Sequence, residues 1–518
     1  MKKIIFTLFT LLLLTSVKTY AQEFEYITPI NSEEIKWRPV VYELQNGNFI
    51  VTAQVYGGAA ANNTILLCLS DEGELLFERN LDSYLGHRFG NFVFIETENN
   101  GLFSIGTTSN STNGYLKFYK FDPSNLEVIY ETTHAVDLSS TTEPSKLILN
   151  GAIDDNGEGL AISFRKIAPD ANPNDSVFFW KLDYEGNIKH TNNLEVRTNS
   201  FDPVTNALIR NNSGEGYFYF TNGESFSNGD PISRHFDNNF GLLSQTEIVL
   251  EAPRDKTFLD HLDVKQLPDG NFLIGADGRF HEFLVTKLLA FCCEFDEQMQ
   301  LVDSIAKGPF DETEERRIQN QVPNENCIDF IDENQIFFGF NLDNPGIGTP
   351  VPRPKYFMLY SLDRELNTVK EFYYGIKDNS TYLWISDIAA TKDGGVICAG
   401  HFCDFVAHNA TNYNCFDVTQ LVIKKFDSRA FNSIDEAHAN NLKVALVYPN
   451  PGKNEMLVRT TLENATVELY DLQGKLIVKQ SLNDKITTIN ASEWQSGTYL
   501  YKIVQNEKVI ESGKWIKE

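Results

Sequence analysis

The sequence repeats one unit of 54 to 64 residues, and this repeat limits the possible folds more than any other feature. Each copy has an apolar strand, a turn, and a second apolar strand; after a variable segment, a third strand ends at Asp and a polar turn. The sixth copy is degenerate because Asn replaces the turn Gly. The first turns of the seven copies lie at Gly47, Gly101, Gly157, Gly214, Gly270, Asn334 and Gly394.

Each copy predicts a small antiparallel sheet. Asn-Gly and Asp-Gly provide the positive φ angles of tight hairpins, and the runs around them, such as Asn271–Gly275, are short and apolar. One four-stranded sheet cannot bury both of its faces, whereas sheets packed radially can. We therefore expect an all-β fold with a seven-bladed β-propeller over residues 22–430, and six or eight blades as the alternatives. A β-solenoid would need shorter repeats, and a string of sandwich domains longer ones.

The Asp-Gly turns resemble those of uncharacterised Asp-Gly-repeat β-propellers in exported bacterial proteins. The sequence lacks the Ser-x-Asp-x-Gly box of sialidase-type propellers and the Trp-Asp and kelch patterns. Gly-x-Ser-x-Gly, His-Glu-x-x-His and phosphate-loop motifs are also missing. The resemblance therefore implies a fold and no particular activity, because propellers carry many unrelated functions.

The start of the chain has the features of a cleavable signal peptide. Two lysines precede a mostly apolar stretch at Ile4–Val17, and Thr19 and Ala21 place small residues before the expected cut. The stretch is shorter than a membrane-spanning helix, which disfavours a membrane anchor. We expect residues 1–21 to be removed by cleavage before Gln22, and the mature protein to have no transmembrane segment.

The body of the chain is strongly acidic. The formal net charge is −27, and removal of Lys2, Lys3 and Lys18 with the signal peptide brings it to −30. Residues 443–518 contribute 10 basic and 9 acidic side chains, a net of +1, so the mature body carries about −31. Such a surface repels nucleic acid and anionic lipid headgroups, so we expect no nucleic-acid partner.

The chain has seven cysteines, an odd number, so at least one thiol stays free or pairs with another chain. No C-x-x-C pair suggests a zinc site, and we predict no metal and no cofactor. Cys403 and Cys415 flank one loop and form a possible disulfide. Cys292 and Cys293 are adjacent on a predicted strand, so their side chains should point to opposite faces.

The repeat ends near Asp427, and a polar linker at 431–443 precedes a predicted small β-sandwich at 444–518. Four motifs follow in order: Tyr448-Pro449-Asn450-Pro451, the turn of Leu469–Lys475 with Gly474, the strand that starts at Gly497-Thr498-Tyr499, and the closing Lys514-Trp515-Ile516-Lys517. Together these motifs resemble the type A C-terminal sorting domain of the type IX secretion system of Bacteroidetes. The resemblance implies an immunoglobulin-like fold, the type IX machinery as partner, passage through the periplasm to the cell surface or medium, and removal of the domain near the linker.

The candidate ligand site follows from the order of the strands. Both recurrent turns lie on one side of the propeller, so the connections between second and third strands project from the other side. The long connections are Ala168–Asp175, Asn341–Lys355 and His401–Thr419. The candidate ligand-binding residues in the last of these are His401, Asp404, His408 and Tyr413, whose spacing matches no metal site.

The Asp residues that end the third strands could suggest paired carboxylates for glycoside cleavage. A residue repeated in every blade is better explained by turn chemistry, because Asp side chains bond nearby backbone amides. We identify no catalytic residue. The first hypothesis is a non-catalytic protein that binds an extracellular glycan or protein. The alternative is an exported hydrolase or lyase acting on polysaccharide or peptide, and the third is a scaffold for surface assembly.

Overall fold

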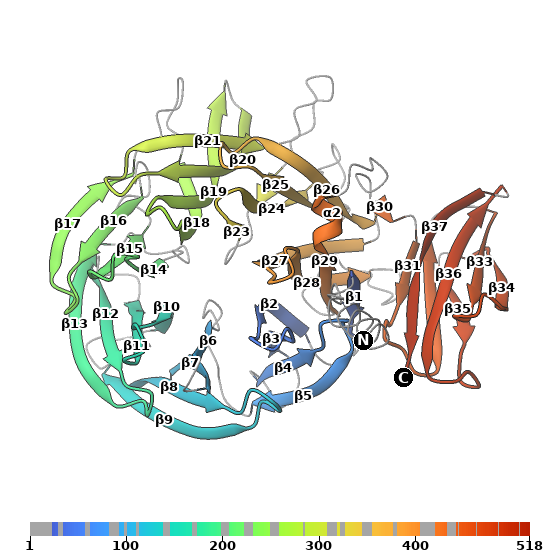
Figure 1. Cartoon of the computed structure of the whole chain (residues 1–518), viewed down its shortest axis with the longest axis horizontal. Helices are drawn as coiled ribbons and strands as arrows, with labels where there is room; N and C mark the ends of the chain where they lie inside the picture. Colours follow the sequence, from blue (N-terminus) through green and yellow to red (C-terminus); the bar gives the residue numbers. More distant parts are fainter. Residues whose placement is uncertain are drawn as a thin grey trace, which may run out of the picture.

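The protein is almost entirely β-structure in the computed structural model, which confirms the all-β part of the predicted fold class (Figure 1). One short helix, α2 (Ser428–Asn432), occurs among the residues that the structure describes. No helix in that part of the chain is long and apolar enough to cross a membrane. The described residues are 23–28, 35–56, 63–81, 93–97, 101–109, 113–137, 146–167, 174–197, 207–221, 231–248, 258–282, 285–307, 319–321, 327–343, 355–376, 381–404, 420–432, 442–443, 445–460, 462, 464–484, 486–506 and 508–518. The predicted signal peptide lies outside them.

The repeat units form seven sheets over the described part of the body, numbered here in chain order. Sheet 1 is β2 (Ile35–Glu43), β3 (Phe49–Tyr56), β4 (Asn63–Leu69) and β5 (Leu75–Leu81); sheet 2 is β6 (Val93–Thr97), β7 (Gly101–Ser109), β8 (Asn113–Phe121) and β9 (Val128–Asp137). Sheet 3 is β10 (Lys146–Asp154), β11 (Leu160–Ile167), β12 (Asn174–Leu182) and β13 (Ile188–Arg197); sheet 4 is β14 (Ala207–Arg210), β15 (Tyr217–Thr221), β16 (Ile232–Phe236) and β17 (Leu242–Glu247). Sheet 5 is β18 (Phe258–Gln266), β19 (Phe272–Glu282), β20 (Val285–Phe295) and β21 (Leu301–Lys307).

Sheets 6 and 7 depart from the simple pattern. In sheet 6, β22 (Gln319–Gln321) and β23 (Ile328–Asp332) both pair with β24 (Gln335–Asp343), which is followed by β25 (Lys355–Leu362) and β26 (Thr368–Ile376). In sheet 7, β27 (Thr381–Ala390), β28 (Val396–Asp404) and β29 (Gln420–Phe426) are completed by the N-terminal strand β1 (Phe24–Ile27). Because β1 pairs with β29, the two ends of the body meet in one sheet. Figure 1 shows the sheets arranged as a ring.

The core is divided among the junctions between neighbouring sheets. Seven buried clusters each join two successive sheets, and one of them joins sheet 7 to sheet 1 through contacts that include Phe24 and Phe49. Cys292 lies in the cluster shared with sheet 6, and Cys293 in the cluster shared with sheet 4, which confirms that they face opposite ways. Each sheet therefore buries its two faces against its two neighbours.

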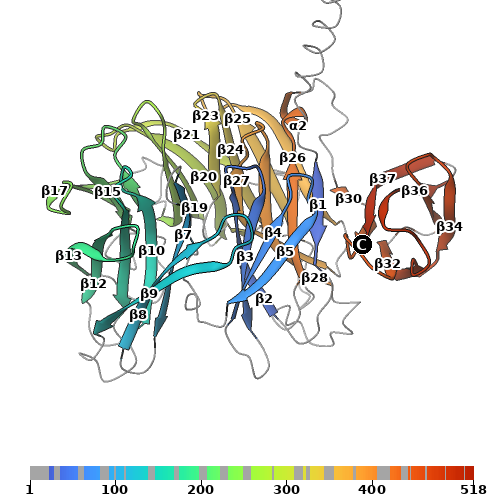
Figure 2. The same cartoon turned by 60° about the horizontal axis from the view of Figure 1, so that its bottom comes forward.

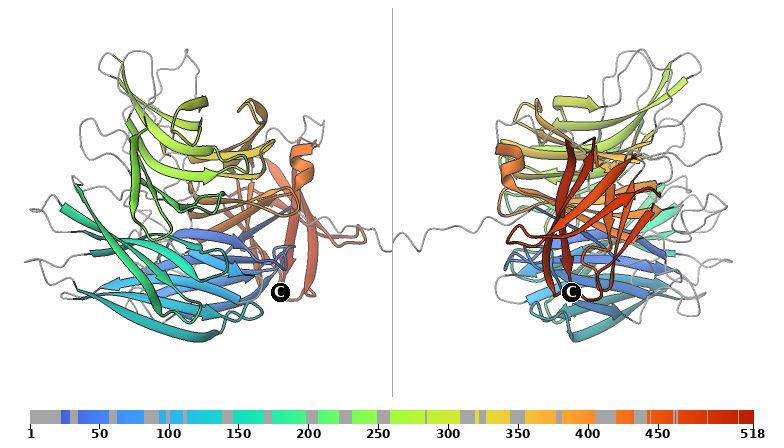
Figure 3. Two further views of the ribbon diagram at one scale, coloured as in Figure 1. Left: turned by 60° about the vertical axis from the view of Figure 1, so that its left-hand side comes forward. Right: turned by 90° about the vertical axis from the view of Figure 1, so that its right-hand side faces the viewer.

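The C-terminal region is a separate two-sheet unit beside the ring (Figures 2 and 3). One sheet contains β31 (Ala445–Tyr448), β32 (Glu455–Thr460) and β35 (Ile486–Asn490). The other contains β34 (Leu476–Leu482), β33 (Ala465–Tyr470), β36 (Gly497–Gln505) and β37 (Lys508–Lys517). Alternate side chains of both sheets fill one core around the fully buried Trp515. A two-residue strand, β30 (Leu442–Lys443), precedes this unit.

Candidate functional site

The side of the ring that carries the recurrent turns, called here the turn face, is occupied by contacts that hold the sheets together. Near the turns, side chains of one sheet bond to the backbone of the next. The amide of Gln45 donates to Glu96 at 2.6 Å, that of Lys392 to Glu43 at 2.8 Å, and that of Asn212 to Gln266 at 3.0 Å. These bonds cross three different junctions between sheets, so the polar side chains that form them help to hold the ring together.

The repeated Asp residues that follow the third strands serve their own turns. The carboxylates of Asp183, Asp237, Asp296 and Asp363 each accept a backbone N–H from four residues further along the chain, at 2.7–2.8 Å. Such a carboxylate already has its hydrogen-bond partner inside a local turn. The prediction of turn chemistry is confirmed, and pairing of these residues for catalysis is not supported.

Three further carboxylates lie on the inner strands of sheets 5, 6 and 7, and each bonds the next sheet. Asp263 accepts the amides of Cys327 at 2.7 Å and Ile328 at 2.8 Å. Asp329 accepts the amide of Ala390 at 2.7 Å, and Asp387 that of Val41 at 2.6 Å. The strands of Asp263 and Asp387 have a register irregularity at these residues, as a β-bulge does when it redirects a side chain.

Lys265 balances part of this negative charge. Burial opposes its charged form, but Asp329, Asp263 and Asp387 outweigh burial and hold the pKa of Lys265 above its usual value. Burial raises the pKa of Asp263 to about 6, against the lowering effect of Lys265 and the bonded amides. Among the described side chains, no group of His, Cys, Asp and Glu could hold a metal ion. We therefore interpret the inner carboxylates as links between sheets.

The opposite side of the ring, called here the loop face, begins where the second strands end. The register of each second strand against its third strand places a polar residue at the same level in four sheets: Thr107, Arg165, Asn341 and His401. All four are buried, with at most 4% of their surface exposed. The Asn341 amide bonds both polar atoms of the Ile385 backbone, at 2.7 and 2.8 Å. We call these four residues the polar tier.

The loop-face end of sheet 7 combines the polar tier with an aromatic side chain. His401 on β28 pairs with Trp384 on β27, and the two rings stack with centroids 6.5 Å apart and an interplanar angle of 21°. Gln420, the first residue of β29, is buried and donates to the carbonyl of Thr28 at 2.5 Å. Its side-chain oxygen has no hydrogen-bond partner among the described residues. Trp384 and His401 offer an aromatic face and an imidazole on the side of sheet 7 that faces sheet 1, since His401 also pairs with Leu421 of that junction. Gln420 pairs with Phe402 and therefore lies on the other side of sheet 7, where it offers an amide acceptor.

The residues predicted from sequence are placed as follows. His401 and Asp404 belong to β28 rather than to the loop, because the strand continues to Asp404. His408, Tyr413 and Cys415 lie outside the described residues, so the predicted cluster and the Cys403–Cys415 disulfide stay predictions. The cysteines that the structure does describe in full are all buried: Cys68, Cys292, Cys293, Cys327 and Cys398.

Sequence reasoning missed the remaining members of the polar tier and Trp384. A signal was present, because the second strands of these four sheets are mostly apolar over five residues before the polar residue of the tier. Single polar residues at strand ends are common, however, so only the aligned register of several copies shows that they share a level.

The four C-terminal motifs gather at two places. Pro449, Asn450 and Pro451 lie against β37: the Trp515 indole donates to the Pro449 carbonyl at 2.6 Å, and Lys514 lies next to Trp515. Gly474 has a φ of +80° in the turn after β33, a conformation that favours Gly. Gly497 begins β36.

Comparison with known proteins identifies this unit. Residues 446–518 match the family model described as a secretion system C-terminal sorting domain. A funoran endo-beta-hydrolase of Wenyingzhuangia aestuarii is 31% identical over 87 residues, which are 16% of this chain and 12% of that protein. The chain therefore spans only a small part, 12%, of the length of that enzyme.

Solved structures resemble most of the chain at low sequence identity. Polysaccharide lyase Uly1 is 7% identical, with a TM-score of 0.46, and the match covers 79% of this chain and 100% of the lyase. The α-L-arabinanase of Penicillium chrysogenum is also 7% identical, with a TM-score of 0.36 and coverage of 79% and 99%. A subtype N10 neuraminidase-like protein from a little yellow-shouldered bat virus sample is 8% identical, with a TM-score of 0.35 and coverage of 78% and 98%.

The order of motifs in β31 to β37 and the match over residues 446–518 agree. The chain carries a type IX secretion system C-terminal sorting domain and is exported by that system to the cell surface or the medium.

Proposed function

We propose that the body of the protein is a seven-bladed β-propeller, closed by β1, that binds an extracellular glycan or protein on its loop face, and that it is followed by an immunoglobulin-like sorting domain until that domain is removed. Support for the architecture comes from seven sheets with a buried cluster at every junction, including that between sheets 7 and 1. A rigid ring of this kind holds its connecting segments in fixed places, where binding usually occurs.

One observation carries the placement of the site: the stacked Trp384 and His401 at the loop-face end of sheet 7. Aromatic faces suit the apolar faces of sugar rings and aromatic side chains of proteins, and buried amides and imidazoles orient polar groups of a ligand. On the turn face, the described polar side chains such as Glu96 and Asp237 are engaged in junctions and turns.

The alternative is an exported hydrolase or lyase acting on polysaccharide or peptide. Such an enzyme would need acid and base groups directed at a substrate. The gathered carboxylates Asp263, Asp329 and Asp387 each accept a backbone amide instead. This pattern favours binding over turnover.

The test is a glycan array and an extracellular protein array probed with the mature chain, with turnover assays on every polymer that binds. Trp384→Ala and His401→Ala should each weaken binding roughly fivefold, because a stacking face is worth about 1 kcal/mol. Trp494→Ala, in the sorting domain, is the matched control and should bind normally. Retained affinity in both Trp384→Ala and His401→Ala would refute the placement, and product release from a bound polymer would establish the alternative.

A further inference from the structure

The first strand of the sorting domain contributes to the core of the body. Tyr448 is fully buried in the cluster between sheets 6 and 7, together with Ile27, Phe372 and Tyr374. Its neighbour Val447 lies in the separate core of the sorting domain. Leu457, on β32, also packs against the body cluster. The Tyr of the Tyr-Pro-Asn-Pro motif is thus an apolar contact between the two units.

Backbone bonds reinforce this contact at two sheet edges. The Ile27 amide, on the free edge of β1, donates to the carbonyl of Asn450 at 3.1 Å. The Asn450 side chain also accepts from the Ile516 amide at 2.9 Å and donates to the Lys514 carbonyl at 3.0 Å. One residue therefore connects β1 of the body to β37 of the sorting domain. On sheet 6, β30 pairs in parallel with the outer strand β26.

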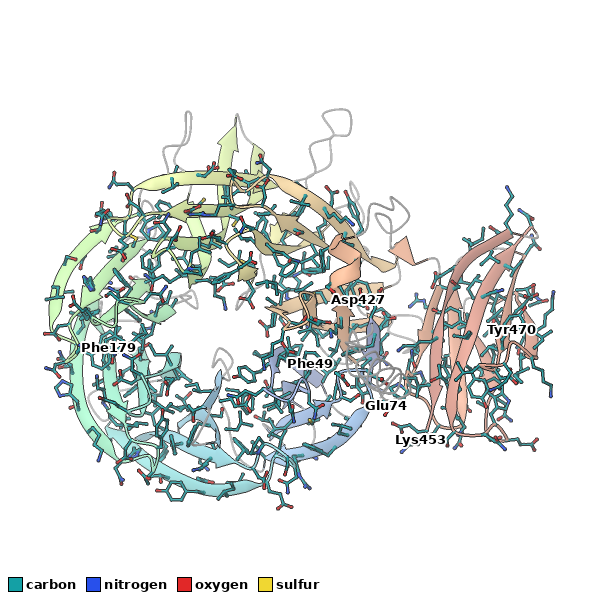
Figure 4. All side chains as sticks on the ribbon, in the orientation of Figure 1. Phe49, Glu74, Phe179, Asp427, Lys453 and Tyr470 are labelled. Carbon is teal, nitrogen blue, oxygen red and sulfur yellow. The ribbon has the colours of Figure 1, made fainter. Side chains whose placement is uncertain are left out.

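The charges on the two sides of the contact are complementary. Burial lowers the pKa of Lys514, and Lys424 of the body adds to this effect, whereas the carboxylates of Glu72, Glu23 and Glu74 on the body counteract it. Figure 4 shows Glu74 on the side of the ring that faces the sorting domain. A body with a charge of about −31 meets a domain with a charge of +1, which favours association.

The two halves of this surface come from opposite ends of the body. Ile27 belongs to the first strand of the body, whereas β26, β29 and α2 are among its last elements. They are adjacent only because β1 completes sheet 7. A body whose ring is open lacks the Ile27 edge and the complete cluster around Tyr448.

We propose that sheet 7 and the edge of sheet 6 form a docking surface for the sorting domain of the same chain, and that docking of this domain is coupled to closure of the ring: docking requires a closed ring, whereas the ring can stay closed when the domain is undocked. The sorting domain is then docked only on a body that has folded and whose ring is closed. This inference goes beyond the proposed ligand binding and does not depend on it.

Hydrogen exchange of the chain without its signal peptide and with its sorting domain still attached tests the docking. The Ile27 amide is bonded to the sorting domain, whereas the adjacent Thr28 amide is bonded to Leu421 within sheet 7, at 3.1 Å. In Tyr448→Ala, exchange at Ile27 should accelerate roughly a hundredfold, which corresponds to about 2.7 kcal/mol, while Thr28 stays protected. Tyr470→Ala is the matched control, because Tyr470 lies on the side of the sorting domain away from the ring (Figure 4) and bonds Glu468. Wild-type protection of Ile27 in a folded Tyr448→Ala protein would overturn the proposal.

A second pair of variants keeps the test decisive. If Tyr448→Ala does not fold, Leu457→Ala removes a contact that is peripheral to the body core, and Ile27 exchange should again rise without a change at Thr28. Phe24→Ala weakens the junction of sheets 7 and 1, where the rings of Phe24 and Phe49 lie 5.8 Å apart. Exchange at Thr28 and Ile27 should then increase by the same factor. A rise at Thr28 with Ile27 still protected would disprove the coupling.

Discussion

Replacement of Asp263 by Asn should change how the stability of the ring depends on pH. The Asp263 carboxylate is 5% exposed and accepts two amides of sheet 6. Burial raises its pKa from an ordinary 3.8 to about 6, despite the opposing effect of Lys265. The folded protein therefore holds this proton more tightly than the unfolded chain does. Its contribution is fully present below pH 4 and is lost as the pH rises through 6.

The size of the effect follows from the shift of about two pKa units, which corresponds to about 3 kcal/mol of unfolding free energy. Asn cannot titrate, so the wild type should gain up to this amount relative to Asp263→Asn as the pH falls from 7.5 to 4. Urea midpoints of the two proteins, measured across this range at constant ionic strength, give the difference directly.

The variant Asp122→Asn is a control in which the stability difference from the wild type should change with pH in the opposite direction. Hydrogen bonds from Ser124 lower the pKa of the exposed Asp122, so its contribution is present at neutral pH and is lost in acid. The difference between wild type and Asp122→Asn should therefore run the other way. If the difference in unfolding free energy between the wild type and Asp263→Asn did not change with pH, the Asp263 carboxyl would not be buried between sheets 5 and 6.

Three further predictions concern the junctions and turns. Asn341→Ala should cost about 2 kcal/mol in urea unfolding, because it leaves the buried N–H and C=O of Ile385 unpaired; an unchanged midpoint would contradict the junction described. Arg364→Met should cost about 3 kcal/mol, since the almost fully buried Glu294 loses its ion pair while Asn271 remains bonded to it; here, Asp269→Asn, which removes only the more exposed partner of Arg364, should have a smaller effect. Asp237→Ala should cost about 1 kcal/mol by freeing the amides of Asn239 and Gly241 and should leave ligand affinity unchanged; altered affinity would mean that the repeated Asp acts outside its turn.

Local chemistry explains which features could be predicted from the sequence. The turns at Gly47 and Gly394, both with positive φ, depend on residues that are adjacent in the chain. The same holds for the Asp turns, although four of them place a large apolar residue in the left-handed region: Leu126, Phe240, Met299 and Leu366. These side chains are buried at sheet junctions. Packing therefore overrides the usual preference for Gly at this position.

Long-range features could not be predicted in the same way. Nothing in residues 24–27 indicates that their partner strand lies at 420–426. The seventh copy gives no sign of lacking its own fourth strand, which β1 replaces after the chain enters α2. The extent of β28 was underestimated because His401 and Asp404 are polar, and polarity at a strand end resembles a loop. The role of Tyr448 depends on how two units meet, which the motif alone does not encode.

In this protein, the turn face is assigned a structural role and the loop face is assigned ligand binding. Hydrogen exchange of the mature protein, with and without a ligand identified on the arrays, tests this directly. Protection is expected in peptides that contain the ends of β27, β28 and β29 near Trp384, His401 and Gln420, and in the segments between second and third strands. Protection confined to the turns around Gly47, Gly157 and Gly270 would contradict it.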